Sequence, residues 1–167
     1  MNILLTGATG FVGSYILAKL IKSGYNLTII KRVGSNTKRI DKFLNNIDVI
    51  DNITNINNSK AFDCIIHAAT TYEIGNYAGS NLLSSNINLP VYLLDFAIES
   101  NCQKFINIST FIAKYESMPP NRYALTKKTF EQWGAFYSKF YSLNFVNVTL
   151  HQAYGVDDNP NKFIPWL

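Results

Sequence analysis

Residues 3–13 read ILLTGATGFVG and decide the fold of this chain. A short apolar strand pattern runs directly into a glycine-rich turn, and a helical pattern follows from Phe11. Gly7 permits a tight turn, Gly10 lets the backbone approach a diphosphate, and Gly13 lets the helix pack closely. The helix N-terminus offers a diphosphate free N–H groups and the positive end of the helix dipole. The stretch predicts a dinucleotide-binding turn; a turn that is glycine-rich for steric reasons alone is the alternative.

Strand patterns alternate with helical patterns along the chain, which is typical of a parallel α/β sheet. We expect strands at about residues 2–6, 26–31, 47–50, 63–67, 104–109 and 144–150. Helices are expected at 11–23, at 82–100 with a kink or late start at Pro90, and after Asn121. The Asn-rich stretch 51–60 predicts a short or irregular crossover. The prediction is a Rossmann-type, doubly wound parallel sheet in one domain, residues 1–167.

Composition narrows the class of protein. Of the 167 residues, 47% are hydrophobic, which is enough to build a core. No apolar run approaches the roughly 18 residues of a membrane span, and no basic leader precedes the first strand, so we expect a cytoplasmic protein without a membrane partner. The net charge of +4 is small and spread out, which suits an anionic ligand but does not predict nucleic-acid binding. Cys64 and Cys102 are expected to be reduced packing residues, and no metal site is predicted.

The last helical pattern contains Tyr123-Ala-Leu-Thr-Lys127. A spacing of four puts Tyr123 and Lys127 on the same helix face, one turn apart. An ammonium near a phenol is expected to lower the pKa of the phenol from about 10, which would make Tyr123 a usable proton donor and acceptor near neutral pH. The alternative is an ordinary exposed pair, because this spacing also occurs by chance.

A second set of polar residues ends the strand pattern Ile106-Asn-Ile-Ser-Thr110. Ligands of open α/β sheets bind beyond the carboxyl ends of the strands, so these hydroxyls should face the same cleft as Tyr123. The ordered motifs TGATGFVG, FDCIIHAA, INIST and YALTK together resemble the extended short-chain dehydrogenase/reductase family, which contains nucleotide-sugar epimerases, dehydratases and reductases. The resemblance covers almost the whole chain.

The resemblance implies a role for each matching residue. Tyr123 is the implied proton donor, Lys127 holds the nicotinamide ribose and assists Tyr123, and Thr110 contacts the reacting oxygen, with Ser109 as second candidate. Asn86 matches a helix asparagine that supports the active-site backbone. The implied cofactor contacts outside the catalytic helix are Gly7, Thr9, Gly10, Phe11, Val12, Gly13, His67, Ala68 and Ala69. For His67 a structural role at the strand end is expected rather than proton transfer.

The end of the second strand bears on the choice of cofactor. NAD enzymes place a carboxylate there for the adenosine ribose, whereas this chain has Lys31 and Arg32 and no acid before Asp41. Cationic side chains suit a 2′-phosphate, so NADP is favoured, with NAD possible. The alternative is that both are solvated loop charges.

Two residues that differ from those of sugar-dehydrating relatives limit the reactions that we expect of this chain. Relatives that dehydrate sugars carry Asp-Glu directly after the threonine, where this chain has Phe111-Ile112. The segments 123–150 and 161–167 are similar to CDP-abequose synthase-like reductases of 4-keto deoxysugars, which implies NADP-dependent reduction of a nucleotide-linked 4-ketosugar. Two other functions stay open: an epimerase with tightly bound NAD, and a non-catalytic NADP-binding fragment or sensor. For the reductase, small carbonyl substrates such as flavonoid-type ketones also stay open.

Two departures from the family pattern and one aromatic pattern complete the expectations. His151-Gln152-Ala153 stands where the family has Phe-Asn-Val. The resemblance also implies that the chain ends near half the family length, so we expect the C-terminal substrate-binding portion to be missing. A broad aromatic stripe recurs at helical spacing on the last helix. In the family this helix pairs with its copy, so we expect a homodimer; the alternative is that the stripe is entirely core. The stripe comprises Phe130, Trp133, Tyr137, Phe140 and Tyr141.

Overall fold

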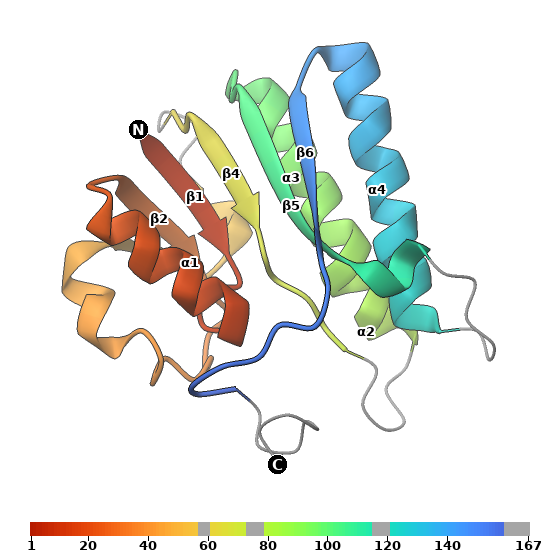
Figure 1. Cartoon of the computed structure of the whole chain (residues 1–167). Coiled ribbons are helices and arrows are strands. Elements are labelled where there is room, and N and C mark those ends of the chain that lie inside the picture. Colours follow the sequence, from red (N-terminus) through yellow and green to blue (C-terminus); the bar gives the residue numbers. More distant parts are fainter. Residues whose placement is uncertain (57–60, 73–78, 115–120, 159–167) are drawn as a thin grey trace.

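A computed structural model describes residues 1–56, 61–72, 79–114 and 121–158 of the chain. In these residues six parallel strands form one sheet in the order β3-β2-β1-β4-β5-β6, with helices on both faces (Figure 1). This is the doubly wound order that the sequence predicts. The strands are β1 (Asn2–Thr6), β2 (Asn26–Ile30), β3 (Asp48–Ile50), β4 (Cys64–His67), β5 (Lys104–Thr110) and β6 (Asn144–Leu150).

The order of the strands reverses at β1. The chain runs outward from β1 to β2 and β3, then returns to place β4 on the other side of β1. The connection after β1 therefore leads toward β2, whereas the connection after β4 leads toward β5 on the other side. The loops that follow β1 and β4 thus diverge at the carboxyl edge of the sheet. In open α/β sheets this switch point is where ligands bind.

Two hydrophobic clusters cover the two faces of the sheet. Alternate residues of β1 divide between them: Leu4 joins the cluster under the helices α3 (Leu89–Glu99) and α4 (Arg122–Tyr141), and Leu5 joins the cluster under α1 (Phe11–Lys22). Cys64 and Cys102 are free and buried, one in each cluster, and burial raises the pKa of the Cys64 thiol to about 11. Both thiols are therefore packing residues.

The helix expected at 82–100 is built in three parts. It begins as α2 (Gly79–Leu83), continues through one π-helical segment, η3 (Ser84–Asn88), and becomes α3 at Leu89. Pro90 lies in the first turn of α3, where its missing N–H is tolerated. Such π-helical turns are frequent at functional sites. Between β3 and β4 the structure describes only the short 3-10 helix η2 (Ile53–Asn55), and residues 57–60 lie outside the described residues.

The helix α4 begins where the sequence predicts it. The Asn121 side chain accepts a hydrogen bond from the Ala124 N–H at 3.1 Å and caps the helix. Pro119 and Pro120 lie outside the described residues. After β6 the chain crosses the carboxyl edge toward α1 (Figure 1), where Tyr15 Oη donates to the Val156 carbonyl at 2.8 Å. Residues 151–158 thus run past the glycine-rich turn.

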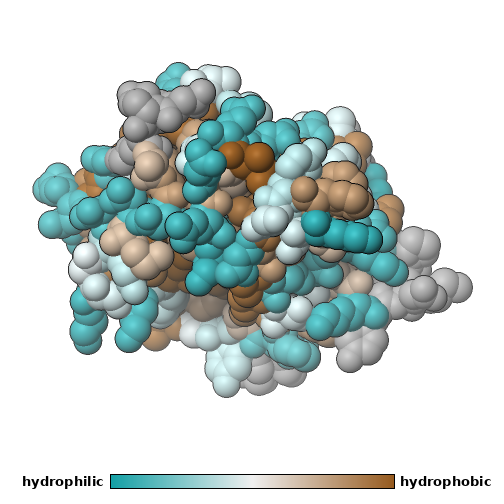
Figure 2. Space-filling model, turned by 90° about the horizontal axis from the view of Figure 1, so that it is seen from above, coloured by the Kyte–Doolittle hydropathy of each residue, from teal (hydrophilic) through white to brown (hydrophobic). Residues whose placement is uncertain are grey.

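The opposite edge of the sheet, where the strands begin, carries a mixed surface. Figure 2 looks onto this edge from above and shows mostly hydrophilic residues with smaller hydrophobic patches between them.

None of the helices in the described ranges is long and apolar enough to cross a membrane.

Candidate cofactor and active site

The glycine-rich turn after β1 is packed tightly against the backbone of two neighbouring segments. Gly7 has a φ of +74°, and a Cβ there would lie 2.4 Å from the Ala69 backbone nitrogen. A Cβ on Gly13 would lie only 2.0 Å from the Gly7 carbonyl oxygen. Gly13 therefore lets α1 approach the turn itself rather than a strand. At the helix N-terminus Gly10 offers no capping side chain, which leaves the edge of the turn open to a ligand.

The segment after β4 is tied to the end of β1. The Thr6 hydroxyl lies 2.8 Å from His67 Nδ1 and accepts a hydrogen bond from the Ala69 N–H at 3.3 Å. The His67 side chain is 1% exposed and packs against the rings of Phe105 and Phe130, so it lies in the core, away from the cleft. Burial holds the pKa of His67 well below its ordinary value. This position in the core fits a structural role for the His67 side chain and not the cofactor contact that the resemblance implies, whereas Ala68 and Ala69 lie at the edge of the turn.

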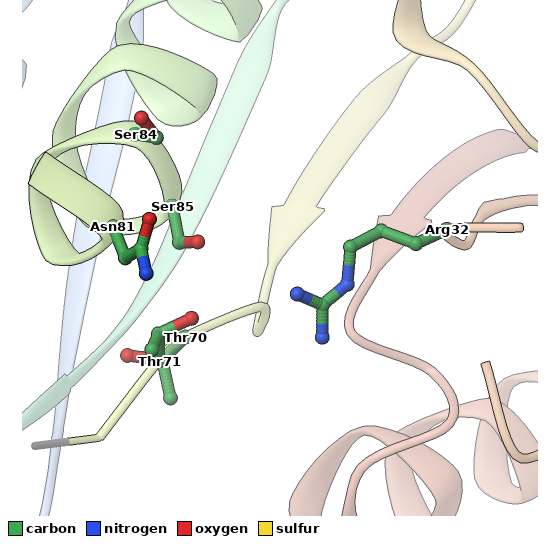
Figure 3. Close-up of a pocket in the computed structure, with 6 residues that line it drawn as sticks. All are labelled: Arg32, Thr70, Thr71, Asn81, Ser84 and Ser85. Carbon is green, nitrogen blue, oxygen red and sulfur yellow. The ribbon is translucent and has the colours of Figure 1, made fainter. Parts of the chain in front are cut away.

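A polar pocket of about 450 Å³ lies between the end of β2 and the segment after β4. In Figure 3 the Arg32 guanidinium points across this pocket toward the hydroxyl side chains of the other wall. Lys31, directly after β2, is held through its backbone N–H, which donates to the Ile50 carbonyl at 2.9 Å. The pocket is lined by Arg32, Thr70, Thr71, Asn81, Ser84 and Ser85. One cation facing several hydroxyls forms a site that suits a phosphate group.

Asn86 joins three segments from the π-helical turn. Its Oδ1 accepts hydrogen bonds from the Thr71 N–H at 2.8 Å and from the Thr70 hydroxyl at 3.2 Å. Its Nδ2 donates to the Thr71 carbonyl and to the Thr126 hydroxyl, both at 3.0 Å. The side chain is buried, so these four bonds satisfy its amide completely. Asn86 thus links the segment after β4 to α4 and supports the backbone.

Lys127 is buried at the end of β5. Its side chain is 3% exposed, and Nζ donates a hydrogen bond to the Ile108 carbonyl at 2.8 Å. Burial lowers the pKa of Lys127 to about 8, while the Glu131 carboxylate acts in the opposite direction. A buried ammonium is therefore attached to the strand that ends in Thr110, two residues after Ile108.

The contacts and the pKa of Tyr123 differ from those that the sequence predicts. Its ring lies 4.8 Å from the ring of Tyr72, between centroids, and its hydroxyl forms hydrogen bonds with those of Tyr72 and Thr70. Burial raises the pKa of Tyr123 above its ordinary value, and the interaction with Tyr72 raises it further. The predicted lowering by Lys127 is wrong for this arrangement, because Lys127 donates to a backbone carbonyl and burial disfavours the phenolate.

Thr110 ends β5 on the side opposite to Ser109. Residues at alternate positions of β5 are buried, and Ser109 belongs to the buried set, whereas Thr110 is half-buried. The next residue, Phe111, stacks on His151 with ring centroids 5.4 Å apart and nearly parallel planes. An aromatic pair therefore lies directly beside Thr110.

Sequence reasoning missed several side chains of this site. Thr70, Thr71 and Tyr72 contact the predicted residues Asn86 and Tyr123. The available signal was a polar run directly after Ala69 at the carboxyl end of a strand. Ser84, Ser85 and Glu131 gave no signal, because polar residues on a helix are ordinary and only the packing shows which of them face the site.

The glycine-rich turn, the strand order and the polar cleft at the switch point define a dinucleotide-binding α/β protein. The sequence model of the NAD dependent epimerase/dehydratase family matches residues 3–167, and the chain belongs to this family.

Two curated relatives and one solved structure are similar to the chain. CDP-abequose synthase from Salmonella typhimurium is 32% identical, with 99% of this chain and 57% of the relative covered. The same enzyme from Salmonella muenchen is 30% identical, with 99% and 58% covered. The crystal structure of UDP-glucuronic acid 4-epimerase from Bacillus cereus in complex with NAD matches with a TM-score of 0.84 at 25% identity, over 97% of this chain and 60% of that one. The chain spans less than two thirds of these relatives' lengths.

Proposed function

We propose that this chain is the cofactor-binding half of an NADP-dependent reductase that acts on a nucleotide-linked 4-keto deoxysugar. The observation that carries the proposal is the arrangement of α4 on β5: a buried Lys127 bonds to the strand that ends in Thr110, one helical turn from Tyr123. The resemblance to CDP-abequose synthase supports the substrate class.

The residues at the switch point fit a dinucleotide. The close approaches at Gly7 and Gly13 keep the turn free of side chains, which leaves a cradle for a diphosphate in front of Thr9, Gly10, Phe11 and Val12. Arg32 faces the polar pocket and would bind a 2′-phosphate, with Lys31 beside it. Ala68 and Ala69 would line the cofactor, and Lys127 with Tyr123 would hold its nicotinamide ribose. When bound, NADPH supplies the hydride for reduction of the ketone.

The protonation state of Tyr123 suits a proton donor. Burial raises the pKa of Tyr123, so its hydroxyl carries at neutral pH the proton that a ketone oxygen takes up on reduction, but it is a weaker acid than the sequence predicts. Thr110 would donate a hydrogen bond to the same oxygen. Once it turns from the Ile108 carbonyl, to which it donates in this structure, the Lys127 ammonium on the same helix face would stabilise the phenolate that remains.

Dehydration is not supported by the side chains after Thr110. Removal of a proton and loss of water need a separate base and acid, and the Phe111–His151 stack offers no carboxylate at that place. Epimerisation is the second candidate, because the structure of the Bacillus cereus epimerase in complex with NAD resembles this chain. Tightly bound NAD released by denaturing the purified protein would favour the epimerase over the reductase.

The direct test is reduction of a nucleotide 4-keto deoxysugar by the chain extended with the substrate-binding half that its relatives possess. Tyr123→Phe should lower the rate by about 10²- to 10⁴-fold with NADPH affinity nearly unchanged. Tyr92→Phe, at an exposed tyrosine of α3, is the matched control. If Tyr123→Phe keeps most of the rate, the proton donor lies elsewhere.

We also propose a homodimer built on α3 and α4. The structure divides the aromatic stripe: Phe130 and Tyr137 are core, and the Tyr137 hydroxyl donates to Asp95 of α3. The other three residues, together with Phe136, remain exposed, with Trp133 at 42% and Phe140 at 62%. Exposed aromatic side chains gathered on one helix favour a partner surface.

The dimer is tested by light scattering of the chain at tens of micromolar. Trp133→Glu with Phe140→Glu should yield monomers, because two buried charges would oppose association. Tyr25→Glu, at an exposed tyrosine before β2, should leave the dimer intact. A monomeric unmodified chain would show that this surface does not associate.

A further inference from the structure

The helix α4 carries a third polar side chain on the face that holds Tyr123 and Lys127. Glu131 follows Lys127 by four residues and therefore lies one turn further along that face. The Ser109 hydroxyl donates a hydrogen bond to Glu131 Oε1. Ser109 is buried and Glu131 is half-buried, so this contact is largely shielded from water.

The end of β5 is held by α4 at two consecutive residues. Lys127 binds the Ile108 carbonyl, and Glu131 binds the Ser109 side chain. Thr110 follows directly, and side chains alternate along a strand, so both contacts act on the backbone beneath Thr110 rather than on its hydroxyl. The pair thus holds the strand end without using the Thr110 hydroxyl, which accepts a hydrogen bond from the Ile112 N–H at 3.4 Å.

The charges around Lys127 are few in the described parts of the chain. His67 faces it from β4, and Tyr123 and Glu131 lie on its own helix. Burial lowers the pKa of His67 and raises that of Tyr123, so both are neutral near pH 7. Glu131 supplies the negative charge that opposes the burial of the ammonium.

We propose that Glu131 is a positioning residue that keeps the Lys127 ammonium charged while it anchors, through Ser109, the end of the strand that carries Thr110. Only the effect of Glu131 on catalysis rests on the proposed function. In that function a charged Lys127 would stabilise the phenolate that forms when Tyr123 gives its proton to the ketone oxygen. The electrostatic role itself exists without substrate or cofactor.

The test is a titration of Lys127 in the chain itself, followed by NMR of its ε-methylene group and assigned with Lys127→Arg. Glu131→Gln keeps the shape of the side chain but removes its charge, and it should move the midpoint of the Lys127 titration down by about one pH unit. Glu131→Asp, which restores the charge, should recover part of that shift. Glu99→Gln, at an exposed carboxylate of α3, removes the same charge and should move the midpoint little.

An equal shift in Glu131→Gln and Glu99→Gln would overturn the proposal. If the spectrum shows that Glu131→Gln does not fold, Glu131→Asp decides instead, because its shorter side chain draws the charge back toward the helix and away from its place beside Lys127. A lower Lys127 midpoint in that variant supports the proposal, and an unchanged midpoint rejects it. Neither result depends on reductase activity, so failure here is distinct from failure of the proposed function.

Discussion

The two sides of the switch point are built from different contacts. On the β1–α1 side the turn is shaped by backbone atoms that touch where glycines leave room. On the β5–α4 side the site consists of polar side chains from several elements, including the buried Asn86 and Lys127 and the half-buried Glu131. The first side is rigid for steric reasons, and the second depends on hydrogen bonds and charge.

The two sides should therefore respond differently to substitutions and to pH. A backbone turn tolerates no added atom but is indifferent to pH, because it contains no titratable group. A network of buried polar groups tolerates changes of shape better and responds to pH, because burial has moved the pKa values of Lys127 and Tyr123. Single substitutions on each side can separate the two behaviours.

The largest effect is expected for Gly13→Ala on the backbone side. The new Cβ would lie 2.0 Å from the Gly7 carbonyl oxygen, so either α1 or the turn must move. We expect a loss of about 3 kcal/mol in the free energy of unfolding, with NADPH binding abolished. Urea denaturation and calorimetric titration measure both quantities.

The control for that substitution is Gly79→Ala. Gly79 begins α2, and the nearest atom to an added Cβ is the end of the Arg122 side chain at 3.9 Å. This variant should be neutral or slightly more stable, since alanine favours a helix. Equal losses in both variants would mean that the close approach at Gly13 does not control the turn.

A smaller effect is expected from the buried ammonium on the side-chain side. The folded-state pKa of Lys127, about 8, lies below the unfolded value of about 10.4, so between them the unfolded chain binds more protons and stability rises with pH. Relative to Lys127→Met, the chain should gain about 2 kcal/mol in the free energy of unfolding from about pH 7 to about pH 9.5.

Urea denaturation at the two pH values measures this gain. Lys19→Met, at an exposed lysine of α1, corrects for the loss of one charge. A difference between chain and variant that does not change with pH would mean that Lys127 is far better solvated than its 3% exposure indicates.

The smallest effect is expected at the pocket that joins the two sides. Arg32→Ala should reduce the preference for NADPH over NADH by about tenfold, because one charge-assisted hydrogen bond to the 2′-phosphate is lost from an exposed side chain. Calorimetric titration of both cofactors gives the ratio. Lys38→Ala removes an exposed charge from the same loop and should leave the ratio unchanged; equal affinities for NADPH and NADH in the unmodified chain would contradict the choice of NADP.

The sequence predicted the fold well because its signals are local. Strands β1 and β6 have the predicted bounds, and the other four differ by one residue at an end. Asn121 caps α4 as its position suggested. The helix expected at 82–100 was less accurate, because the π-helical turn around Asn86 is stabilised by contacts with Thr71 and Thr126, which are distant in sequence.

The sequence by itself determined the glycine-rich turn, the alternation of strands and helices, and the four-residue spacing of Tyr123 and Lys127. These are properties of neighbouring residues, fixed by backbone sterics and helical periodicity. Only the tertiary structure decided that Lys127 binds the Ile108 carbonyl, that His67 turns into the core, and that Tyr123 keeps its proton. Burial and hydrogen-bond partners set these outcomes, and both arise from segments that meet only when the sheet is assembled.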